Sequence, residues 1–376
     1  MKLLILTQKV DKNDDVLGFF HGWIAEFAKH FEQVTIIALG VGEYDLPQNV
    51  RVFSLGKEKH LRDAEKDHPL RERTDLGNFK RSVLEEQPWK IKYVIRFYHL
   101  IWRERNNYDT VFVHMNPVYV VLGAPLWHIW KKKVALWYTH RHVDWTLHVA
   151  RKCADNIFTA TAASFRIQSP KLKILGHGIF TEDFMRPDGY VRDIKEKITI
   201  ISVGRLTPIK NLDVLIHAVA ILRDQRVDCA VLLVGSTATS TDKNYLEYLQ
   251  ELVKEKKLDD MVHFVGSIPN KEVMHYYWKS DISINLAPTG GIDKAVLESM
   301  ASGVPVIVAN KAFEEYFGEY KDDLICKEGD AKDLSIKIRA LLERKDQQEL
   351  IAFLTRTVKE KGSAQKLIQQ IVKHIS

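Results

Sequence analysis

Residues 198–235 read ITIISVGRLTPIKNLDVLIHAVAILRDQRVDCAVLLVG, and this stretch decides the fold. It opens with an apolar strand candidate, ITIISVG (198–204). The segment NLDVLIHAVAILRD (211–224) then has apolar residues at helical spacing, and CAVLLVG (229–235) is a second strand candidate. Strand, helix and strand in this order predict two parallel strands joined by a crossover helix.

The same alternation extends in both directions and predicts two doubly wound α/β domains. Further strand candidates are 3–7, 34–39, 110–115, 133–139, 262–268, 281–287 and 304–310, with a helix candidate at 18–31. Pro187, Asp188 and Gly189 break any regular element, so we place the domains at 1–187 and 188–376. The last helix, about 363–376, is a candidate to pack back on the N-terminal domain. Two such domains predict an interdomain cleft at the carboxyl ends of their strands.

The composition excludes several classes of protein. An apolar fraction of 45% and a charged fraction of 28% are typical of a globular protein. No apolar run approaches the length of a transmembrane helix, and MKLLILTQKVD (1–11) is too short for a signal peptide. The 3 cysteines are far apart, which argues against a disulfide framework or zinc site and favours a reducing cytoplasm.

The excess positive charge lies in the N-terminal half. Residues 1–185 hold 27 Lys+Arg against 21 Asp+Glu, whereas residues 186–376 hold 28 of each. This asymmetry suggests an acidic partner, such as a phosphate-bearing substrate or an anionic membrane. Nucleic acid is disfavoured, because no basic run with stacking aromatics matches a known motif.

One segment, PWKIKYVIRFYHLIWRER (88–105), spaces Trp89, Tyr93, Phe97 and Ile101 at helical intervals among basic residues. This pattern fits an interfacial helix on an anionic membrane. It also fits a helix packed on the N-terminal sheet, with its long basic side chains reaching solvent, as most surface helices are amphipathic.

Two cations flank the first turn of the C-terminal half. Gly204 and Arg205 follow a strand candidate, and Lys210 precedes a helix candidate. Such a turn can hold a diphosphate, with Arg205 binding bidentately and Lys210 acting as a point charge. A solvated loop with incidental charges is the alternative. A second elbow, PTGGIDKAVLESMASG (288–303), brings two glycines to a helix N-terminus, where an anion is favoured.

The two segments together are more specific than either alone. VGRLTPIKNLDVLIHA (203–218), followed by VLESMASGVPVIVAN (296–310), resembles the retaining GT-B glycosyltransferases of family 4, also called group 1. The resemblance covers the C-terminal half, whereas the N-terminal half matches mainly through its element order and VFVHMNP (111–117). It implies a nucleotide sugar held mainly by 188–376, an acceptor held by 1–187, and no cofactor or required metal.

The resemblance also implies roles for single residues. Arg205 and Lys210 would neutralise the diphosphate, Glu298 would accept hydrogen bonds from the ribose, and His114 would reach towards the donor sugar. A structural role for His114 is the alternative. The implied catalytic residues are Arg205, Lys210, Glu298 and His114. The implied nucleotide-sugar-binding residues are Gly204, Arg205, Lys210, Gly235, Gly266, Ile268, Thr289, Gly290, Gly291, Ile292, Asp293 and Glu298, and the acceptor-side candidates are Gly18, His140 and Arg141.

The chain departs from the family pattern at one position. The family usually has a second glutamate eight residues before the one matched by Glu298, and this sequence has Gly290 there. Either the donor sugar is bound differently, by Thr289, glycine amides or Asp293, or the site has kept binding and lost catalysis. Asp293 could also simply cap the helix.

We therefore expect a retaining glycosyltransferase that uses a UDP- or GDP-linked sugar. The basic, aromatic N-terminal half suggests a lipid-linked or glycan acceptor in surface polysaccharide or glycolipid synthesis. It also suggests a cytoplasmic protein peripheral to the inner face of the plasma membrane. The alternatives are a sugar-nucleotide epimerase of the same fold and a non-catalytic nucleotide-sugar-binding module.

Overall fold

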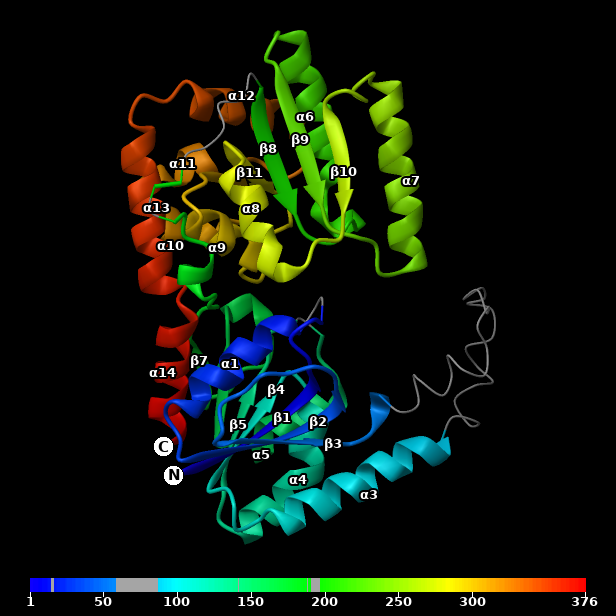
Figure 1. Cartoon of the computed structure of the whole chain (residues 1–376), viewed down its shortest axis with the longest axis vertical. Helices are drawn as coiled ribbons and strands as arrows, with labels where there is room; N and C mark the ends of the chain where they lie inside the picture. Colours follow the sequence, from blue (N-terminus) through cyan, green and yellow to red (C-terminus); the bar gives the residue numbers. More distant parts are fainter. Residues whose placement is uncertain (15–16, 59–86, 141, 188, 191–196) are drawn as a thin grey trace. The chain divides into compact units, whose positions relative to one another are not determined.

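The computed structural model describes residues 1–14, 17–58, 87–140, 142–187, 189–190 and 197–376. It contains two compact units, Met1–Leu175 with Ile368–Ser376, and Gly176–Leu367. The packing thus groups residues 176–187 with the second unit, and the end of the chain with the first. Figure 1 shows the elements of both units.

The first unit is built on a parallel sheet of seven strands in the order β3-β2-β1-β4-β5-β6-β7. Its elements are β1 (Lys2–Val10), α1 (Gly18–Ala28), β2 (Gln33–Val41), β3 (Val50–Ser54), α3 (Gln87–Arg103), β4 (Thr110–His114), α4 (Pro117–Ile129), β5 (Lys133–Trp137), α5 (Trp145–Cys153), β6 (Asn156–Thr159) and β7 (Leu172–Ile174). The sequence predicts β1, β2, β4, β5 and α1 but misses β3, β6 and β7, which are short or only partly apolar.

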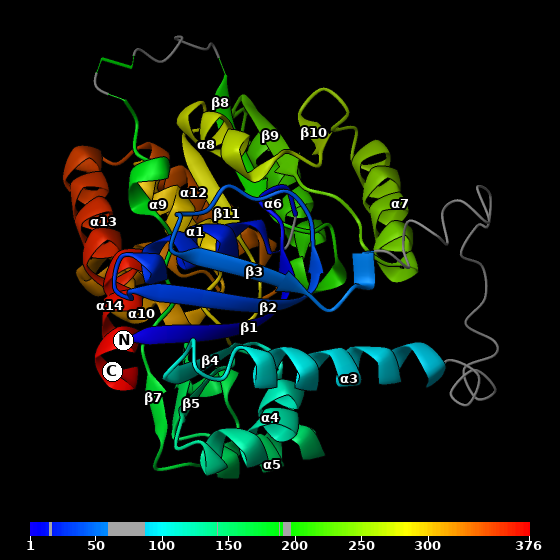
Figure 2. The same ribbon diagram turned by 60° about the horizontal axis from the view of Figure 1, so that its bottom comes forward.

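Alternation along the strands assigns the two faces of this sheet to different helices. Val111 and Val113 of β4 join a core cluster with residues of α3, α4 and α5. Phe112 packs instead against Phe27 of α1, with ring centroids 5.1 Å apart. Figures 1 and 2 show the same arrangement, with α1 on one face and α3, α4 and α5 on the other.

The end of the chain is part of the first unit. Residues 368–376 include most of α14 (Ala364–Ile375). The Lys133 ammonium donates to the Ser376 carbonyl at 2.7 Å, and the His374 ring stacks on Phe158 with centroids 6.0 Å apart.

The second unit has a parallel sheet of five strands in the order β10-β9-β8-β11-β12. Its strands are β8 (Ile198–Val203), β9 (Cys229–Val234), β10 (Val262–Gly266), β11 (Ile282–Asn285) and β12 (Val306–Val308). Its longer helices are α6 (Leu212–Asp224), α7 (Ser240–Glu255), α8 (Val273–Trp278), α9 (Lys294–Ala301), α12 (Ala331–Leu342) and α13 (Gln347–Lys361), with short turns of helix between β12 and α12. All five strands match the sequence prediction, and so do α6 and the helix α9 that follows the 288–293 loop.

The amphipathic segment at 88–105 forms α3, and it packs on the sheet. Tyr93, Phe97 and Ile101 are buried in the core cluster of the first unit. Phe97 stacks on Tyr119 of α4, with centroids 5.7 Å apart. The apolar spacing singled out in the sequence is therefore the core-facing side of the helix, and a membrane role has to be judged on its other faces.

Candidate functional site

The strand order of the second unit creates a topological switch point between β8 and β11. From β8 the chain crosses outward to β9 and β10, and it returns on the other side to β11 and β12. Loops at the carboxyl ends of β8 and β11 therefore diverge, which is where open parallel sheets bind ligands. Gly204, Arg205 and Lys210 follow β8, and the 288–293 loop follows β11.

Three predicted glycines occupy the adjacent carboxyl ends of β8, β9 and β10. Gly204, Gly235 and Gly266 have positive φ angles of 146°, 142° and 86°. The Gly235 amide donates to Gly266 O at 2.8 Å, and the Gly204 amide donates to Val234 O at 2.9 Å. A Cβ on Gly235 would lie 1.9 Å from Gly204 O, so only glycine permits this close approach.

The two predicted cations differ in their surroundings. Arg205 is exposed. Lys210 ends a short 3₁₀ turn, Pro208–Lys210, with its side chain only 20% exposed. A Cβ on Gly204 would lie 3.3 Å from Lys210 Cε, so the lysine side chain passes directly over this glycine.

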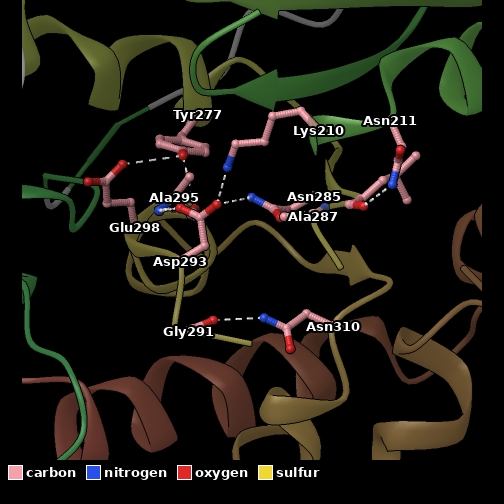
Figure 3. A network of polar contacts seen from close by, with 11 residues as sticks. Lys210, Asn211, Tyr277, Asn285, Ala287, Gly291, Asp293, Ala295, Glu298 and Asn310 are labelled. Atoms are coloured by element: carbon pink, nitrogen blue, oxygen red, sulfur yellow. Dashed lines mark hydrogen bonds and ion pairs between the residues drawn. The ribbon is translucent and has the colours of Figure 1, made fainter. Parts of the chain in front are cut away.

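Lys210 and Asp293 form an ion pair across the switch point (Figure 3). The Asp293 Oδ2 atom also accepts from Asn285 Nδ2 at 2.9 Å. Its Oδ1 atom accepts from the Ala295 amide at 3.3 Å, which makes Asp293 the N-cap of α9. Burial would raise the pKa of this carboxyl, but Lys210 and Asn285 hold it below its usual value. The capping role considered for Asp293 is present, and Asp293 also engages Lys210.

Glu298 lies one turn further along α9 and is 9% exposed. Its Oε2 atom accepts from the Tyr277 hydroxyl at 3.4 Å, and the same hydroxyl is 3.0 Å from Ala295 O. Burial raises the pKa of the Glu298 carboxyl, the positive charge of Lys294 opposes that rise, and Asp293 adds to it. The carboxylate is thus held in place by the protein on one side of α9.

His177 shares this electrostatic environment. Burial lowers the pKa of its imidazole to about 3, and the charge of Lys294 acts in the same direction. Its Nδ1 atom accepts from the Gly178 amide at 2.9 Å, which favours the neutral ring. His177 therefore lies within the electrostatic reach of Lys294, the first residue of α9.

Asn310 organises the loop where the family's other acid is missing. The buried Gly290 donates its amide to Asn310 Oδ1 at 3.2 Å, and Asn310 Nδ2 donates to Gly291 O at 2.8 Å. Thr289 is exposed, and its hydroxyl accepts from the Lys311 amide at 3.2 Å. Ile292 is 8% exposed and belongs to the core. Asn310 and the Lys311 amide therefore help to fix residues 289–291.

The remaining predicted residues have these positions. Ile268 follows β10 and packs partly buried against the core. His114 ends β4, is 1% exposed, stacks on Phe20 at 3.9 Å, and has Nδ1 3.4 Å from Thr7 Oγ1. Gly18 begins α1, His140 is exposed after β5, and Arg141 lies outside the described residues. The burial of His114 fits the structural alternative, and its donor-site role stays a prediction.

Sequence reasoning missed three polar residues of this network, Tyr277, Asn285 and Asn310. Asn285 is the last residue of β11, and Asn310 follows β12 by two residues. A polar side chain at the carboxyl end of a buried parallel strand is a usable signal, because that edge of the sheet holds the ligand site. Tyr277 carries no such signal, since its hydroxyl reaches α9 only through tertiary packing.

Two negative findings concern the described parts of the chain. They contain no group of three or more His, Cys, Asp or Glu side chains that could hold a metal ion. None of their helices combines the length and apolarity needed to cross a bilayer.

Comparison with known proteins places this geometry in a family. Residues 191–363 match the model of the glycosyl transferases group 1. This part of the chain is a domain of the glycosyl transferases group 1 family. One similar protein is the GDP-mannose-dependent alpha-(1-6)-phosphatidylinositol monomannoside mannosyltransferase of Mycobacterium tuberculosis, 29% identical over 46% of this chain and 50% of that protein. Another is the alpha-monoglucosyldiacylglycerol synthase of Streptococcus pneumoniae, 25% identical over 45% of this chain and 41% of that protein.

These matches cover only part of each protein. The aligned regions span 38% to 62% of the curated relatives they match. The group 1 glycosyltransferase match also lies entirely within the second unit, where the predicted phosphate cations and Glu298 are found.

Solved structures extend the likeness in fold to the whole chain. Anabaena Alr3699/HepE in complex with UDP has a TM-score of 0.72 at 15% identity, covering 100% of this chain and 99% of that one. Sucrose-phosphate synthase from Thermosynechococcus elongatus also has a TM-score of 0.72, at 16% identity, covering 100% and 98%. The prediction of a GT-B fold with two parallel-sheet α/β domains is therefore confirmed.

Proposed function

We propose that this group 1 glycosyltransferase transfers a sugar from a UDP- or GDP-linked donor to an acceptor hydroxyl, with retention of anomeric configuration. The observation that carries the proposal is the polar network of Lys210, Asp293, Asn285 and Glu298 at the switch point of the second sheet. It combines a cation for phosphate with a buried, oriented carboxylate for ribose hydroxyls.

Each polar group has a task in this reaction. Lys210, with exposed Arg205 beside it, would stabilise the charge that develops on the nucleotide diphosphate as the glycosidic bond breaks. Glu298, held by Tyr277, would accept hydrogen bonds from the ribose. The amide-rich 289–291 loop would contact the donor sugar in place of the missing acid. A donor diphosphate must compete with Asp293 for Lys210.

The relatives support the choice of donor and acceptor class. The mycobacterial relative is named as GDP-mannose-dependent, and Anabaena HepE was solved with UDP-glucose. The names of two relatives place their products on lipids, phosphatidylinositol monomannoside and diacylglycerol. We therefore infer a lipid-linked or glycan acceptor and a place at the cytoplasmic face of a membrane, in glycolipid or surface polysaccharide synthesis.

The test begins with thermal stabilisation by UDP, GDP and their common sugar derivatives. A ligand at 100 times its dissociation constant adds about 2.7 kcal/mol to the free energy of unfolding, which gives a measurable shift. The donor that stabilises most is then incubated with and without a panel of lipid and glycan acceptors. We expect nucleotide release to depend on acceptor, and the Arg205→Ala and Lys210→Ala variants to lose both binding and release.

Two results would redirect the proposal. Conversion of the sugar nucleotide without any acceptor would identify an epimerase. Tight nucleotide binding with no turnover in any acceptor mixture would identify a binding module.

A further inference from the structure

Helix α3 presents three distinct faces along its length. One face is buried and includes Tyr93, Phe97 and Ile101. A second face is apolar yet exposed: Ile91 is 55% exposed, Ile95 64%, Tyr98 36% and Trp102 54%. These four residues follow one another at intervals of four, three and four, so they form a single stripe along the helix.

Helix α4 carries a second stripe with the same spacing. Val118 is 41% exposed and Ile129 is 73% exposed. Between them, at the same intervals, Pro125 is exposed and Leu122 is half-buried. Isolated exposed apolar residues are normal, but two parallel stripes are not explained by chance exposure.

The two stripes form one surface, which we call the α3/α4 patch. The Tyr98 hydroxyl donates to Leu122 O at 2.9 Å, joining the middle of one stripe to the middle of the other. The Trp102 ring contacts the Trp130 ring beside Ile129, with centroids 5.5 Å apart. The helices also lie side by side in both views (Figures 1 and 2).

Positive charge borders this patch without any acid on the two helices. Residues 91–103 contain Lys92, Arg96 and Arg103, residues 117–133 contain three lysines at 131–133, and neither segment contains Asp or Glu. Lys92, Arg96, His99 and Arg103 recur at intervals of four, three and four along the exposed third face of α3. Arg103 pairs with Glu104 just beyond the helix, but Glu104 itself is 2% exposed and also binds Arg51.

We propose that the α3/α4 patch docks the protein on the surface of an anionic lipid bilayer. The apolar stripes would enter the boundary between headgroups and acyl chains, and the basic face of α3 with the exposed Lys131 would contact acidic headgroups. Tyr98 and Trp102 are the aromatic types that prefer the membrane interface. Charge complementarity selects this occupant, because a second copy of the chain would bring the same basic rim against itself.

Such docking would give the proposed transferase access to a lipid-linked acceptor. This purpose rests on the proposed function, whereas the docking surface itself does not. Of the two interpretations of residues 88–105, packing on the sheet holds for the buried face of α3, and the membrane role is proposed here for another face. The membrane-facing residues are Ile91, Ile95, Tyr98 and Trp102, not the buried set with Tyr93 and Phe97.

The experiment measures co-sedimentation of the full chain with vesicles, without donor or acceptor. Vesicles of phosphatidylcholine are compared with vesicles that contain roughly a third phosphatidylglycerol, at about 0.15 M salt. We expect the anionic vesicles to bind the chain at least about tenfold more strongly. The Lys92→Gln/Arg96→Gln variant should bind them roughly 30-fold more weakly, and Ile95→Asn/Trp102→Gln at least about tenfold more weakly.

Matched controls come from the second unit. Ile336→Asn removes an apolar side chain that is 56% exposed on α12, and Lys243→Gln/Lys254→Gln removes two exposed lysines of α7. Both controls should bind vesicles as the parent chain does. All variants should keep the parent's thermal unfolding and its nucleotide-induced shift.

Several results would overturn the docking proposal. The parent chain could bind neutral and anionic vesicles equally well, or both patch variants could bind anionic vesicles as strongly as the parent does. The control variants could also lose as much vesicle binding as the patch variants. A dimer that Ile95→Asn/Trp102→Gln converts to monomer, with vesicle binding unchanged, would assign the patch to self-association. Vesicle binding without any nucleotide-induced stabilisation would instead contradict the proposed function and leave the docking surface standing.

Discussion

Lys210 and Asp293 are 83 residues apart in the sequence and form an ion pair at the switch point of the second sheet. The lysine belongs to the turn after β8, and the aspartate caps the helix that follows β11. The pair therefore joins the two loops that diverge from the switch point. It also means that the predicted phosphate cation already has an anionic partner inside the protein.

This pairing predicts that Asp293→Asn will tighten the binding of nucleoside diphosphate. Asparagine still caps the helix, but it no longer offers a negative charge that the diphosphate must displace from Lys210. We expect the dissociation constant for UDP or GDP to fall several-fold, as measured by calorimetry. Lys210→Ala should raise it roughly 10- to 100-fold, in line with about 1.5–3 kcal/mol for a charged hydrogen bond.

The sugar nucleotide provides the complementary measurement for Asp293. One interpretation of Gly290 is that Asp293 binds the sugar hydroxyls. In that case Asp293→Asn should weaken binding of the sugar nucleotide while it tightens binding of the nucleoside diphosphate. Unchanged binding of both ligands by Asp293→Asn would show that Lys210 does not contact phosphate.

A second prediction concerns Glu298 and the ribose. Glu298→Gln should weaken binding of UDP or GDP by about tenfold, because a neutral amide accepts hydroxyl hydrogen bonds less strongly than a carboxylate. The same substitution should have little effect on a 2′,3′-dideoxy nucleotide, which lacks those hydroxyls. Equal losses for both ligands would assign Glu298 to the structure of α9 rather than to the ribose.

The sequence could predict the backbone of this site but not its side-chain pairing. Apolar strands that end in Gly204, Gly235 and Gly266 are visible in the sequence, because glycine at a strand end marks an unusual backbone. The pairing of Lys210 with Asp293 depends on which strands become neighbours, and strand order is a tertiary property. The sequence kept capping and sugar binding open for Asp293 and did not consider Lys210 as its partner.

The same limit left two interpretations of α3 open. Helical periodicity identifies an apolar face, but a helix with two apolar faces presents two candidates, and the sequence does not say which one the sheet buries. The larger aromatic residues Tyr93 and Phe97 fill the core, and the stripe from Ile91 to Trp102 is left on the surface. Only the structure therefore shows which apolar face of α3 is exposed.

The three strand-end glycines give a third prediction, which concerns stability. Gly235→Ala should lower the free energy of unfolding by more than about 3 kcal/mol, because its Cβ would collide with Gly204 O on top of the positive-φ strain. Gly266→Ala has open space around the added methyl and should cost only the strain, about 1–2 kcal/mol. Urea unfolding of the two variants measures the difference. Equal costs at both positions would contradict the close approach of β8 and β9.

The last prediction concerns pH and His177. Burial, with Lys294 nearby, lowers the pKa of this imidazole from 6.5 to about 3 in the folded chain. Between those values the unfolded chain binds a proton that the folded chain does not, so the free energy of unfolding falls as the pH is lowered. The slope from this one group is at most about 1.4 kcal/mol per pH unit, and it vanishes above the unfolded pKa.

His177→Gln removes this group, so the difference in unfolding free energy between parent and variant should be constant above about pH 7.5. Below about pH 6 the difference should shrink steadily, because only the parent loses stability through His177. Comparing the two proteins cancels the titration of the groups they share, such as the carboxyls. His148→Gln, at an exposed histidine of α5, controls for the loss of an imidazole. If the difference in unfolding free energy between parent and variant stayed constant down to about pH 5, the His177 ring would be free to take up a proton in the folded state. That result would contradict the lowered pKa of His177 and the influence of Lys294 on it.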